Sequence, residues 1–324
     1  MTGVSHSVWF ERQVPEEYAS EIGPRIEVLG PGSASDRFRG IESAAGVVAS
    51  VLNYDGPVMD RASRAVAIVR TGIGYDRVDV DAATVRGIAV CNTPNAPTIS
   101  TAEHAIALLL AVTKGVYTSS DRLRRGEDDL YSRHEAIELD GKTLGLVGFG
   151  RIARRVGAVA RSLGMQVVAF DPFLVNDADA MTRIDNLDEL LSSADVVSVH
   201  VPLTGETRGL FDERRFAAMK PGSYFINTSR GGVVDQEALM GALATGHLRG
   251  AGLDVTDPEP LPADHPLLHR PDVLVTPHVA SATYEGKRRI FRSALAAVLT
   301  VLDGQQPEHL INPEVWPPKR RAGM

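Results

Sequence analysis

The chain has 324 residues, of which 44% are hydrophobic and 23% are charged. This composition is typical of soluble globular proteins and excludes a disordered or fibrous chain, and the length suggests about two domains at roughly 100–200 residues each. The 41 acidic and 34 basic side chains give a net charge of −7, so neither a nucleic acid nor a membrane is expected as a partner.

The cysteine content and the N-terminus both predict a cytoplasmic protein. Cys91 is the single cysteine, which excludes a disulfide framework within the chain and fits a reducing compartment. The first twenty residues carry four charged side chains, unlike a secretory signal. The longest apolar run, Ala105 to Val112, is far shorter than the roughly 18 residues that span a bilayer.

Short apolar runs separated by polar or Gly/Pro-rich turns fill the first third of the chain. Such runs, when they alternate with helical segments, predict parallel sheets of the α/β class. The expected strands are Val8–Phe10, Ile26–Leu29, Val47–Leu52, Ala65–Arg70 and Ile88–Cys91.

The segment from Asn92 to Pro97 contains two prolines and two asparagines, which predict a loop. A helix is expected to follow it, with Ser100 and Glu103 forming a capping box at its start. Its apolar residues recur at helical spacing, which predicts one continuous buried face. They are Ala102, Ala105, Ile106, Leu109, Leu110 and Thr113.

Six further strands are expected after this helix, with helical segments between most of them. Six strands joined by helical crossovers are the number in a complete dinucleotide-binding fold. A long helix is expected from Ser281 to Leu302, and the tail from Asn312 to Met324 is expected to be loose or packed on the surface. The strands are Thr143–Val147, Gln166–Phe170, Val196–His200, Ser223–Asn227, Gly250–Val255 and Val273–Thr276.

The motif Gly148-x-Gly150-x-x-Ala153 lies between an expected strand and an expected helix. Gly148 permits a tight turn, Gly150 lets the backbone approach a pyrophosphate, and Ala153 allows the helix to pack closely on the strand. The free N–H groups of the helix start favour an anion, which the Arg151 guanidinium can also reach.

Asp171 ends the next expected strand, 21 residues after Gly150. A carboxylate at this position accepts hydrogen bonds from an adenosine ribose and repels a 2′-phosphate, so NAD is expected rather than NADP. The alternative is an ordinary strand–helix–strand unit that binds no ligand.

Arg230, Glu259 and His278 each follow one of the later strands, where open α/β sheets bind their ligands. Reduction of a ketone requires a proton donor for the forming alkoxide, and histidine suits this role near neutral pH. An arginine binds a substrate carboxylate through its bidentate guanidinium, and a carboxylate beside the histidine stabilises the imidazolium.

Taken singly, each of these residues has an ordinary structural explanation. An arginine after a strand is commonly a surface ion-pair partner, a glutamate in a proline-rich loop is commonly solvated, and a histidine after a proline is often a turn residue. Their occurrence together, behind a nucleotide-binding turn, favours catalysis.

The ordered motifs resemble those of the D-isomer-specific 2-hydroxyacid dehydrogenase family. Within that family, Leu253–Pro262 and His278–Thr283 look most like the glyoxylate/hydroxypyruvate reductases, and phosphoglycerate dehydrogenases are also similar. The matching segments are Arg70–Asp76, Ser100–His104, Gly148–Ile152, His200–Leu203, Asn227–Gly232, Gly252–Val255, Pro258–Pro260 and Thr276–His278.

The resemblance implies two doubly wound α/β domains, a Rossmann dinucleotide-binding domain inserted in a flavodoxin-like substrate domain. The substrate domain would comprise residues 1–98, the NAD-binding domain residues 99–283, and residues 284–324 would be a helix and tail that rejoin the substrate domain. Family members are commonly homodimers through the dinucleotide domain, so a homodimer is expected.

The resemblance also implies roles for individual residues, and it implies no metal site. Arg230, Glu259 and His278 would be catalytic, and Asp254 would lie near the nicotinamide amide. The substrate carboxylate would bind Arg230 and the loop of Thr71, Gly72, Ile73 and Gly74, since glycines suit a backbone anion cradle. The NAD site would comprise Gly148, Gly150, Arg151, Ile152, Asp171, Pro202, Thr207, Thr228, Ser229, Asp254 and Ala280.

The expected activity is an NAD-dependent interconversion of a 2-keto acid and a D-2-hydroxy acid. Two alternatives remain: an NAD-sensing corepressor-like binding protein, and a dehydrogenase of another small anion such as phosphite. Arg77 departs from the family pattern and is either a second cation near the substrate or a surface charge. Tyr54 and Tyr75 either line the substrate pocket or pack.

Overall fold

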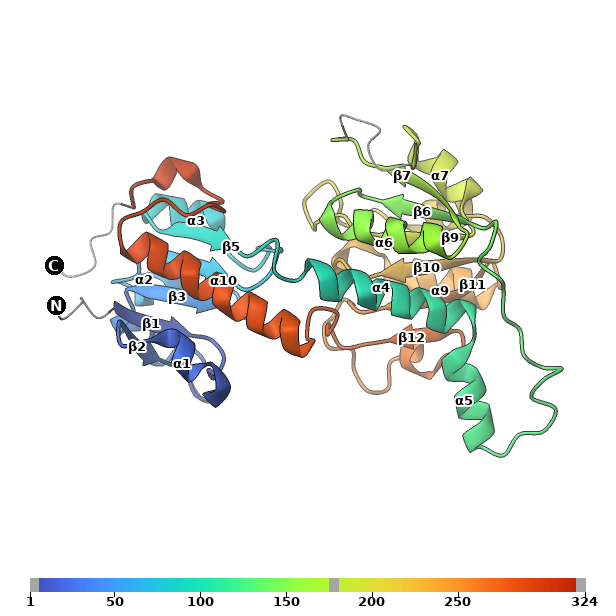
Figure 1. The fold of residues 1–324 in the computed structure, drawn as a ribbon, viewed down its shortest axis with the longest axis horizontal. Coiled ribbons are helices and arrows are strands. Elements are labelled where there is room, and N and C mark those ends of the chain that lie inside the picture. The colour runs from blue at the N-terminus through green and yellow to red at the C-terminus, as the bar shows by residue number, and fades with distance from the viewer. Residues whose placement is uncertain (1–5, 175–180, 319–324) are drawn as a thin grey trace. The chain divides into compact units, whose positions relative to one another are not determined.

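A computed structural model describes residues 6–174 and 181–318 of the chain (Figure 1). It divides into two compact units. Unit 1 consists of the described residues up to Pro97 together with those from Tyr284 onward, and unit 2 is Thr98–Thr283. Each unit contains one parallel sheet with helices packed on both of its faces, which confirms the expected α/β class.

The sheet of unit 1 has the strand order β2-β1-β3-β4-β5, which is the order of flavodoxin-like folds. All five strands were expected, but β3 is shorter than the apolar run predicts. It ends at Ala49 because the N–H groups of Ser50, Val51 and Leu52 donate to the carboxylate of Glu11 instead of to a neighbouring strand. The strands are β1 (His6–Phe10), β2 (Ile26–Leu29), β3 (Gly46–Ala49), β4 (Ala67–Arg70) and β5 (Ala89–Asn92).

Helices α2 (Gly56–Arg61) and α3 (Val80–Val85) cover one face of this sheet, and α10 (Tyr284–Leu302) covers the other. A Cβ at Gly46 would lie 2.5 Å from Val298 Cγ2, so glycine is what lets α10 approach β3 this closely. Tyr54 is buried and donates to Glu11, so this tyrosine packs within the core. A short helix, α1 (Ala19–Ile22), follows β1.

The tail, which was expected to be loose or packed on the surface, is packed over residues 312–318. Asn312 is 1% exposed, and its side chain accepts from the N–H of Val90 and donates to Ile88 O and Thr84 Oγ1. Val315 is also buried. Of the two expected possibilities, packing holds for residues 312–318, and Asn312 and Val315 are buried rather than at the surface, because the Asn312 amide fixes the segment beside β5. Residues 319–324 lie outside the described part of the chain.

The described residues of unit 2 form seven strands where six were expected, in the order β12-β11-β10-β9-β6-β7-β8. The missed strand is β8 (Thr182–Arg183), which is only two residues long and exposed, so it has no apolar pattern to detect. If the strands of this unit are renumbered from 1 at β6 and the sheet is read from the β8 edge, the order is 3-2-1-4-5-6-7. This is the Rossmann order with one strand added. The others are β6 (Thr143–Val147), β7 (Gln166–Phe170), β9 (Val196–Val199), β10 (Ser223–Asn227), β11 (Leu248–Leu253) and β12 (Val273–Val275).

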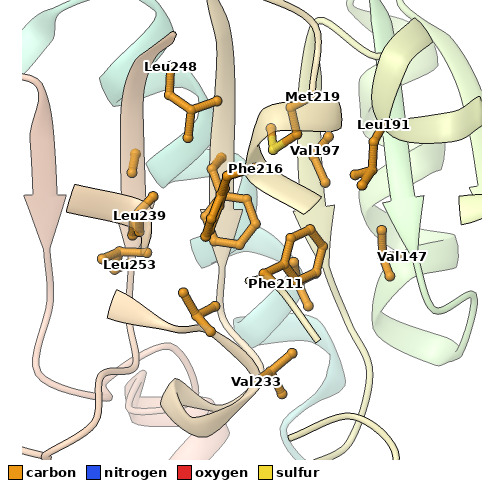
Figure 2. Packing of buried hydrophobic residues seen from close by; sticks show 14 of the residues in the cluster. Val147, Leu191, Val197, Phe211, Phe216, Met219, Val233, Leu239, Leu248 and Leu253 are labelled. Atoms are coloured by element: carbon orange, nitrogen blue, oxygen red, sulfur yellow. The ribbon is translucent and has the colours of Figure 1, made fainter. Parts of the chain in front are cut away.

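Two helices, α4 (Thr98–Thr113) and α6 (Arg151–Ser162), pack on one face of this sheet. The opposite face is covered by α7 (Leu187–Ser193), α8 (Glu213–Ala218) and α9 (Gln236–Ala244). There Phe211, Phe216 and Phe225 form a mutually contacting trio with centroid separations of 4.9–5.8 Å. Figure 2 shows Phe211 and Phe216 among the buried residues of this face. The remaining elements are α5 (Val116–Arg124) and the 3₁₀ turns Glu16–Tyr18, Ile41–Ser43, Gly231–Val233, Pro266–His269 and Pro313–Val315.

The capping box expected at Ser100 is wrong. Helix α4 begins at Thr98, and the Ser100 hydroxyl lies 2.8 Å from Thr283 Oγ1 rather than capping the helix. Burial of the helix also extends beyond the expected apolar face, because Leu108, which is not on that face, is buried. Leu108 packs so closely on β11 that a Cβ at Gly252 would lie 3.0 Å from its Cβ. Similarly, α10 begins at Tyr284, three residues later than the expected start at Ser281.

Among the described residues, no single helix is long and apolar enough to cross a membrane. Helices α4 and α5 pass that test only as a pair bent by 57°, on length and composition alone.

The buried amide of Asn312 gives a test of how the tail is held. Asn312→Ala should lower the free energy of unfolding by about 2–3 kcal/mol, because the buried Val90 N–H and Ile88 carbonyl lose partners. Urea denaturation measures this loss. Asn53→Ala, at an exposed position with one 3.3 Å contact from Arg77, should change stability by less than about 0.5 kcal/mol. Equal losses in the two variants would show that Asn312 does not anchor the tail.

Candidate active site

The sheet of unit 2 brings together the strand ends that carry the three expected catalytic residues. Strands β10, β11 and β12 are consecutive neighbours and run parallel. Arg230 follows β10, Glu259 follows β11 and His278 follows β12. Because parallel strands present their carboxyl ends at one edge, all three residues lie on segments that leave the same edge of the sheet.

His278 and Glu259 form the most direct contact in the site. Nδ1 of His278 lies 2.6 Å from Glu259 Oε1. Since an ionised carboxylate only accepts hydrogen bonds, Nδ1 carries the proton and Nε2 is left to face a ligand. Both side chains are partly exposed, so a small molecule can reach the imidazole.

The backbone of His278 is held in an uncommon conformation. Its φ is +53°, a left-handed value that non-glycine residues rarely adopt. Its N–H donates to the carbonyl oxygens of Asp254 and Thr276, at 2.7 and 3.0 Å. These two bonds fix the turn that presents the imidazole.

The Arg230 segment packs directly against the segment that leads to Glu259. A Cβ at Gly231 would overlap the carbonyl of Thr256, so only glycine allows this approach. Asn227 holds the turn by donating from Nδ2 to the Arg230 carbonyl and by accepting from both the N–H and the hydroxyl of Ser229. The Arg230 guanidinium donates to the Ser229 carbonyl at 2.8 Å.

Asp254 is the buried centre of the site, 1% exposed at the end of β11. Its carboxylate accepts from the Thr276 hydroxyl at 2.6 Å and from the N–H groups of Val279 and Ala280 at 2.9 Å. Burial alone would raise the pKa of Asp254, but these hydrogen bonds and the nearby His104 outweigh it and hold the pKa below its ordinary value. Ala280, expected in the NAD site, thus contributes its backbone N–H to Asp254.

His104 belongs to this network although no role was assigned to it from the sequence. Its Nε2 lies 2.9 Å from Thr276 Oγ1 and 3.4 Å from Asp254 Oδ1. The single hydroxyl proton of Thr276 goes to Asp254, so Thr276 can only accept from His104, and Nε2 must carry a proton. The sequence signals were a histidine at the start of a largely apolar stretch of α4 and its place in the Ser100–His104 segment that resembles the family.

The glycine turn after β6 has the shape that a pyrophosphate needs. Gly148 has a φ of +86°, and a Cβ there would lie 3.0 Å from the His200 carbonyl group. Helix α6 starts after Gly150 with no side-chain cap, and a Cβ at Gly150 would meet nothing within 4 Å. Arg151 is exposed at this free helix start, which suits an anion.

Asp171 and Thr228 leave polar groups for the rest of a dinucleotide. Asp171 accepts from the N–H groups of Phe149 and Phe173, one on each oxygen, and so also fixes the glycine turn. The Thr228 hydroxyl is buried and has no hydrogen-bond partner among the described residues, as expected for a group that a ligand satisfies. These residues fit NAD, whose pyrophosphate and ribose need these donors and acceptors.

The other residues expected around NAD lie close to this turn in the chain's fold. Ile152 is half-buried in the first turn of α6. The Thr207 hydroxyl donates to the Pro202 carbonyl, at 2.5 Å, and shapes the loop that follows β9. No group of His, Cys, Asp and Glu side chains within residues 6–174 and 181–318 is arranged to hold a metal ion.

The loop expected to bind the substrate carboxylate follows β4 in unit 1. Gly72 has a φ of +112°, and its N–H donates to Thr93 Oγ1 at 2.7 Å. The N–H of Thr71 donates to the Ala49 carbonyl. Among the described residues only Ile73 and Gly74 of this loop keep N–H groups without an acceptor, so two backbone donors remain for an anion.

His200 lies beside the glycine turn and gives a pH test of the site's packing. Burial lowers the pKa of His200 to about 4. The unfolded chain binds a proton at this residue below about pH 6.5, whereas the folded chain resists it until about pH 4, so stability falls as the pH falls through this window.

Between pH 7 and pH 5 the wild-type chain should therefore lose up to about 2 kcal/mol more unfolding free energy than His200→Gln does. Urea denaturation at the two pH values measures the difference. His269→Gln, at an exposed position, should show the wild-type loss. Identical losses in the wild type and His200→Gln would contradict the burial of the imidazole.

Comparisons with known proteins agree with this arrangement. Residues 106–280 match the family model of the D-isomer specific 2-hydroxyacid dehydrogenase NAD-binding domain. The chain is 37% identical over 323 residues to a glyoxylate reductase of Thermofilum pendens, and the match covers 95% of each chain. It is similar in structure to a D-lactate dehydrogenase of Aquifex aeolicus complexed with NAD and lactic acid, with a TM-score of 0.83, 29% identity, and coverage of 94% and 98%.

A D-3-phosphoglycerate dehydrogenase of Methanocaldococcus jannaschii is 38% identical over 269 residues, covering 82% of this chain. The match spans only 51% of that relative, so this chain corresponds to about half of it. Together the Rossmann sheet, the glycine turn and these matches establish that the chain belongs to the D-isomer-specific 2-hydroxyacid dehydrogenase family and is an NAD-dependent oxidoreductase of 2-hydroxy and 2-keto acids.

Proposed function

We propose that Arg230, Glu259 and His278 carry out the interconversion of a 2-keto acid and a D-2-hydroxy acid in this chain. The observation that carries the proposal is the 2.6 Å contact between His278 Nδ1 and Glu259 Oε1, at the strand edge next to Arg230. We assign residues 99–283 to NAD binding, and residues 1–98 with 284–324 to the substrate.

NADH, when bound, supplies the hydride that reduces C2 of the keto acid. His278 donates the proton from Nε2 to the oxygen as it becomes an alkoxide, since Nδ1 is committed to Glu259. Glu259 keeps the imidazole oriented and stabilises its protonated form. In the oxidative direction His278 Nε2 accepts the same proton from the hydroxyl group.

In unit 2, Arg230 binds the substrate carboxylate through its guanidinium. In unit 1, the N–H groups of Ile73 and Gly74 are the backbone donors suited to an anion. Asp254 would accept from the nicotinamide amide. Within residues 6–174 and 181–318, its Oδ2 receives only the Ala280 N–H, whereas Oδ1 is contacted by Thr276, Val279 and His104. Gly148, Gly150 and Arg151 would hold the pyrophosphate, and Asp171 would bind the ribose.

Helix α5 and the loop after it support a homodimer. The helix has no buried residue and extends away from the sheet of unit 2 (Figure 1). It exposes Val116, Tyr117 and Leu123, and Tyr131 in the following loop is 95% exposed. An apolar surface of this kind on a projecting segment suits a second copy of the chain. The buried, reduced Cys91 is compatible with a cytoplasmic location.

Replacement of the proposed acid tests the mechanism. His278→Ala should lower kcat with NADH and a 2-keto acid by roughly a hundredfold or more, because general acid catalysis contributes about that factor. His269→Ala removes an exposed histidine from the same unit and should retain wild-type turnover. Wild-type turnover of His278→Ala would reject the assignment. Tight NAD binding without turnover of any keto acid would instead favour the corepressor-like alternative, and turnover of phosphite the small-anion alternative.

Cofactor preference follows from Asp171. The wild type should show at least a tenfold higher kcat/KM with NADH than with NADPH, because the carboxylate repels a 2′-phosphate. Asp171→Ser should reduce this ratio by raising the value for NADPH. A preference of the wild type for NADPH in the same absorbance assay would show that Asp171 does not set the specificity.

A further inference from the structure

A pocket of about 250 Å³ opens in unit 1, at the carboxyl edge of its sheet. Its walls come from the segments that follow three neighbouring strands. Arg12 follows β1, Ser33 and Arg37 follow β2, and Val51 and Leu52 follow β3. The remaining lining residues are Glu11, Pro31 and Gly32.

The pocket has a net positive charge, because two guanidinium groups and a single carboxylate line it. The Glu11 carboxylate accepts from the N–H groups of Ser50, Val51 and Leu52, at 2.5–2.9 Å, and from the Tyr54 hydroxyl at 3.0 Å. Four donors saturate a carboxylate, so Glu11 shapes the loop after β3 and has little capacity left for a guanidinium.

Arg12 and Arg37 have no such partners. Neither side chain makes a hydrogen bond or an ion pair with any residue in the described part of the chain, whereas nearby Arg61 is paired in a bidentate contact with Asp36. A pair of unpaired guanidinium groups lining one small concavity suits an anion with several oxygen atoms, such as a phosphate, sulfonate or carboxylate.

The loop that carries Arg37 is held in place rather than free. The N–H of Ser33 donates to the Asp36 carbonyl at 2.8 Å, and the N–H of Asp36 donates to Ser33 Oγ at 3.1 Å. A Cβ at Gly32 would overlap the Arg37 carbonyl, so glycine lets the two arms of the loop touch. The backbone that positions Arg37 is therefore set before an anion arrives.

The pocket lies beside the loop proposed to bind the substrate carboxylate. That loop follows β4, which is next to β3 and two strands from β1. Arg37 follows β2, which is three strands from β4. Two strand spacings amount to about 10 Å and three to about 14 Å. The loops are also bonded to each other, since Thr71 donates to the Ala49 carbonyl and Tyr54 to the Arg77 carbonyl. A short substrate and long arginine side chains can span this separation, with Val51 and Leu52 against the carbon chain.

We infer that the preferred substrate is a 2-keto acid with a second anionic group at its far end, bound by Arg12 and Arg37. This inference rests on the proposed function, because it places the first carboxylate at the Gly72–Gly74 loop. Arg77 is not part of this subsite, since its guanidinium donates to Asn53 Oδ1 at 3.3 Å.

The test compares two substrates that differ only in the second anion, hydroxypyruvate and its 3-phosphate ester, using the full chain and NADH. The wild type should have a kcat/KM at least tenfold higher with the phosphate ester. Arg12→Gln and Arg37→Gln should each lower this ratio about tenfold, the loss expected for one charged hydrogen bond. Arg39→Gln, an exposed arginine of the same loop outside the pocket, should leave the ratio unchanged.

Pyruvate and 3-sulfopyruvate extend the comparison to a sulfonate. Equal kcat/KM of the wild type for the substrates with and without the second anion would overturn the inference. A preference for the substrate with the second anion that survives both arginine substitutions would overturn it as well. Failure of the proposed function looks different, since no keto acid of either class would then be reduced.

Discussion

The proposed chemistry depends on one contact, that between the His278 imidazole and the Glu259 carboxylate. The two residues are separated by a strand and two loops, and each loop is fixed by bonds that do not involve the contact itself. Gln236 holds the loop before Glu259 by accepting from the Asp257 N–H, while Asp254 holds the turn around His278. The pair is therefore preorganised, which lets a single ring nitrogen act on a ligand without rearrangement.

Asp254 connects this pair to the expected cofactor. A buried carboxylate is costly unless its oxygens are hydrogen-bonded, and here backbone, hydroxyl and imidazole donors meet that requirement. The same bonds tie the ends of β11 and β12 to helix α4. A substitution at His104 or Thr276 thus affects the segment that carries His278, although neither residue touches the imidazole.

The features that were predictable from the sequence are those that depend on local chemistry. The Gly148 turn and Asp171 have a fixed spacing, and most strands of the two sheets lie in apolar runs. Arg230, Glu259 and His278 could be placed at strand ends, yet nothing local shows that β10, β11 and β12 are neighbours in that order. That order is set by packing between distant segments.

The errors have the same origin. Ser100 has the local pattern of a helix cap, but a tertiary contact with Thr283 uses its hydroxyl. Asn312 lies in a proline-rich tail, and the partners of its amide come from β5 and from the segment before it, at Val90, Ile88 and Thr84. The two-residue strand β8 has no apolar residue, and His104 gains meaning only when α4 packs beside Thr276.

The most direct measurement of the central claim is a crystal structure of the chain with NAD⁺ and the unreactive keto acid analogue oxamate. We expect the oxygen that replaces the substrate carbonyl to lie about 2.6–3.2 Å from His278 Nε2, with Nδ1 still bound to Glu259 and the carboxylate on Arg230. An analogue bound out of reach of Nε2, or an imidazole turned away from Glu259, would contradict the account.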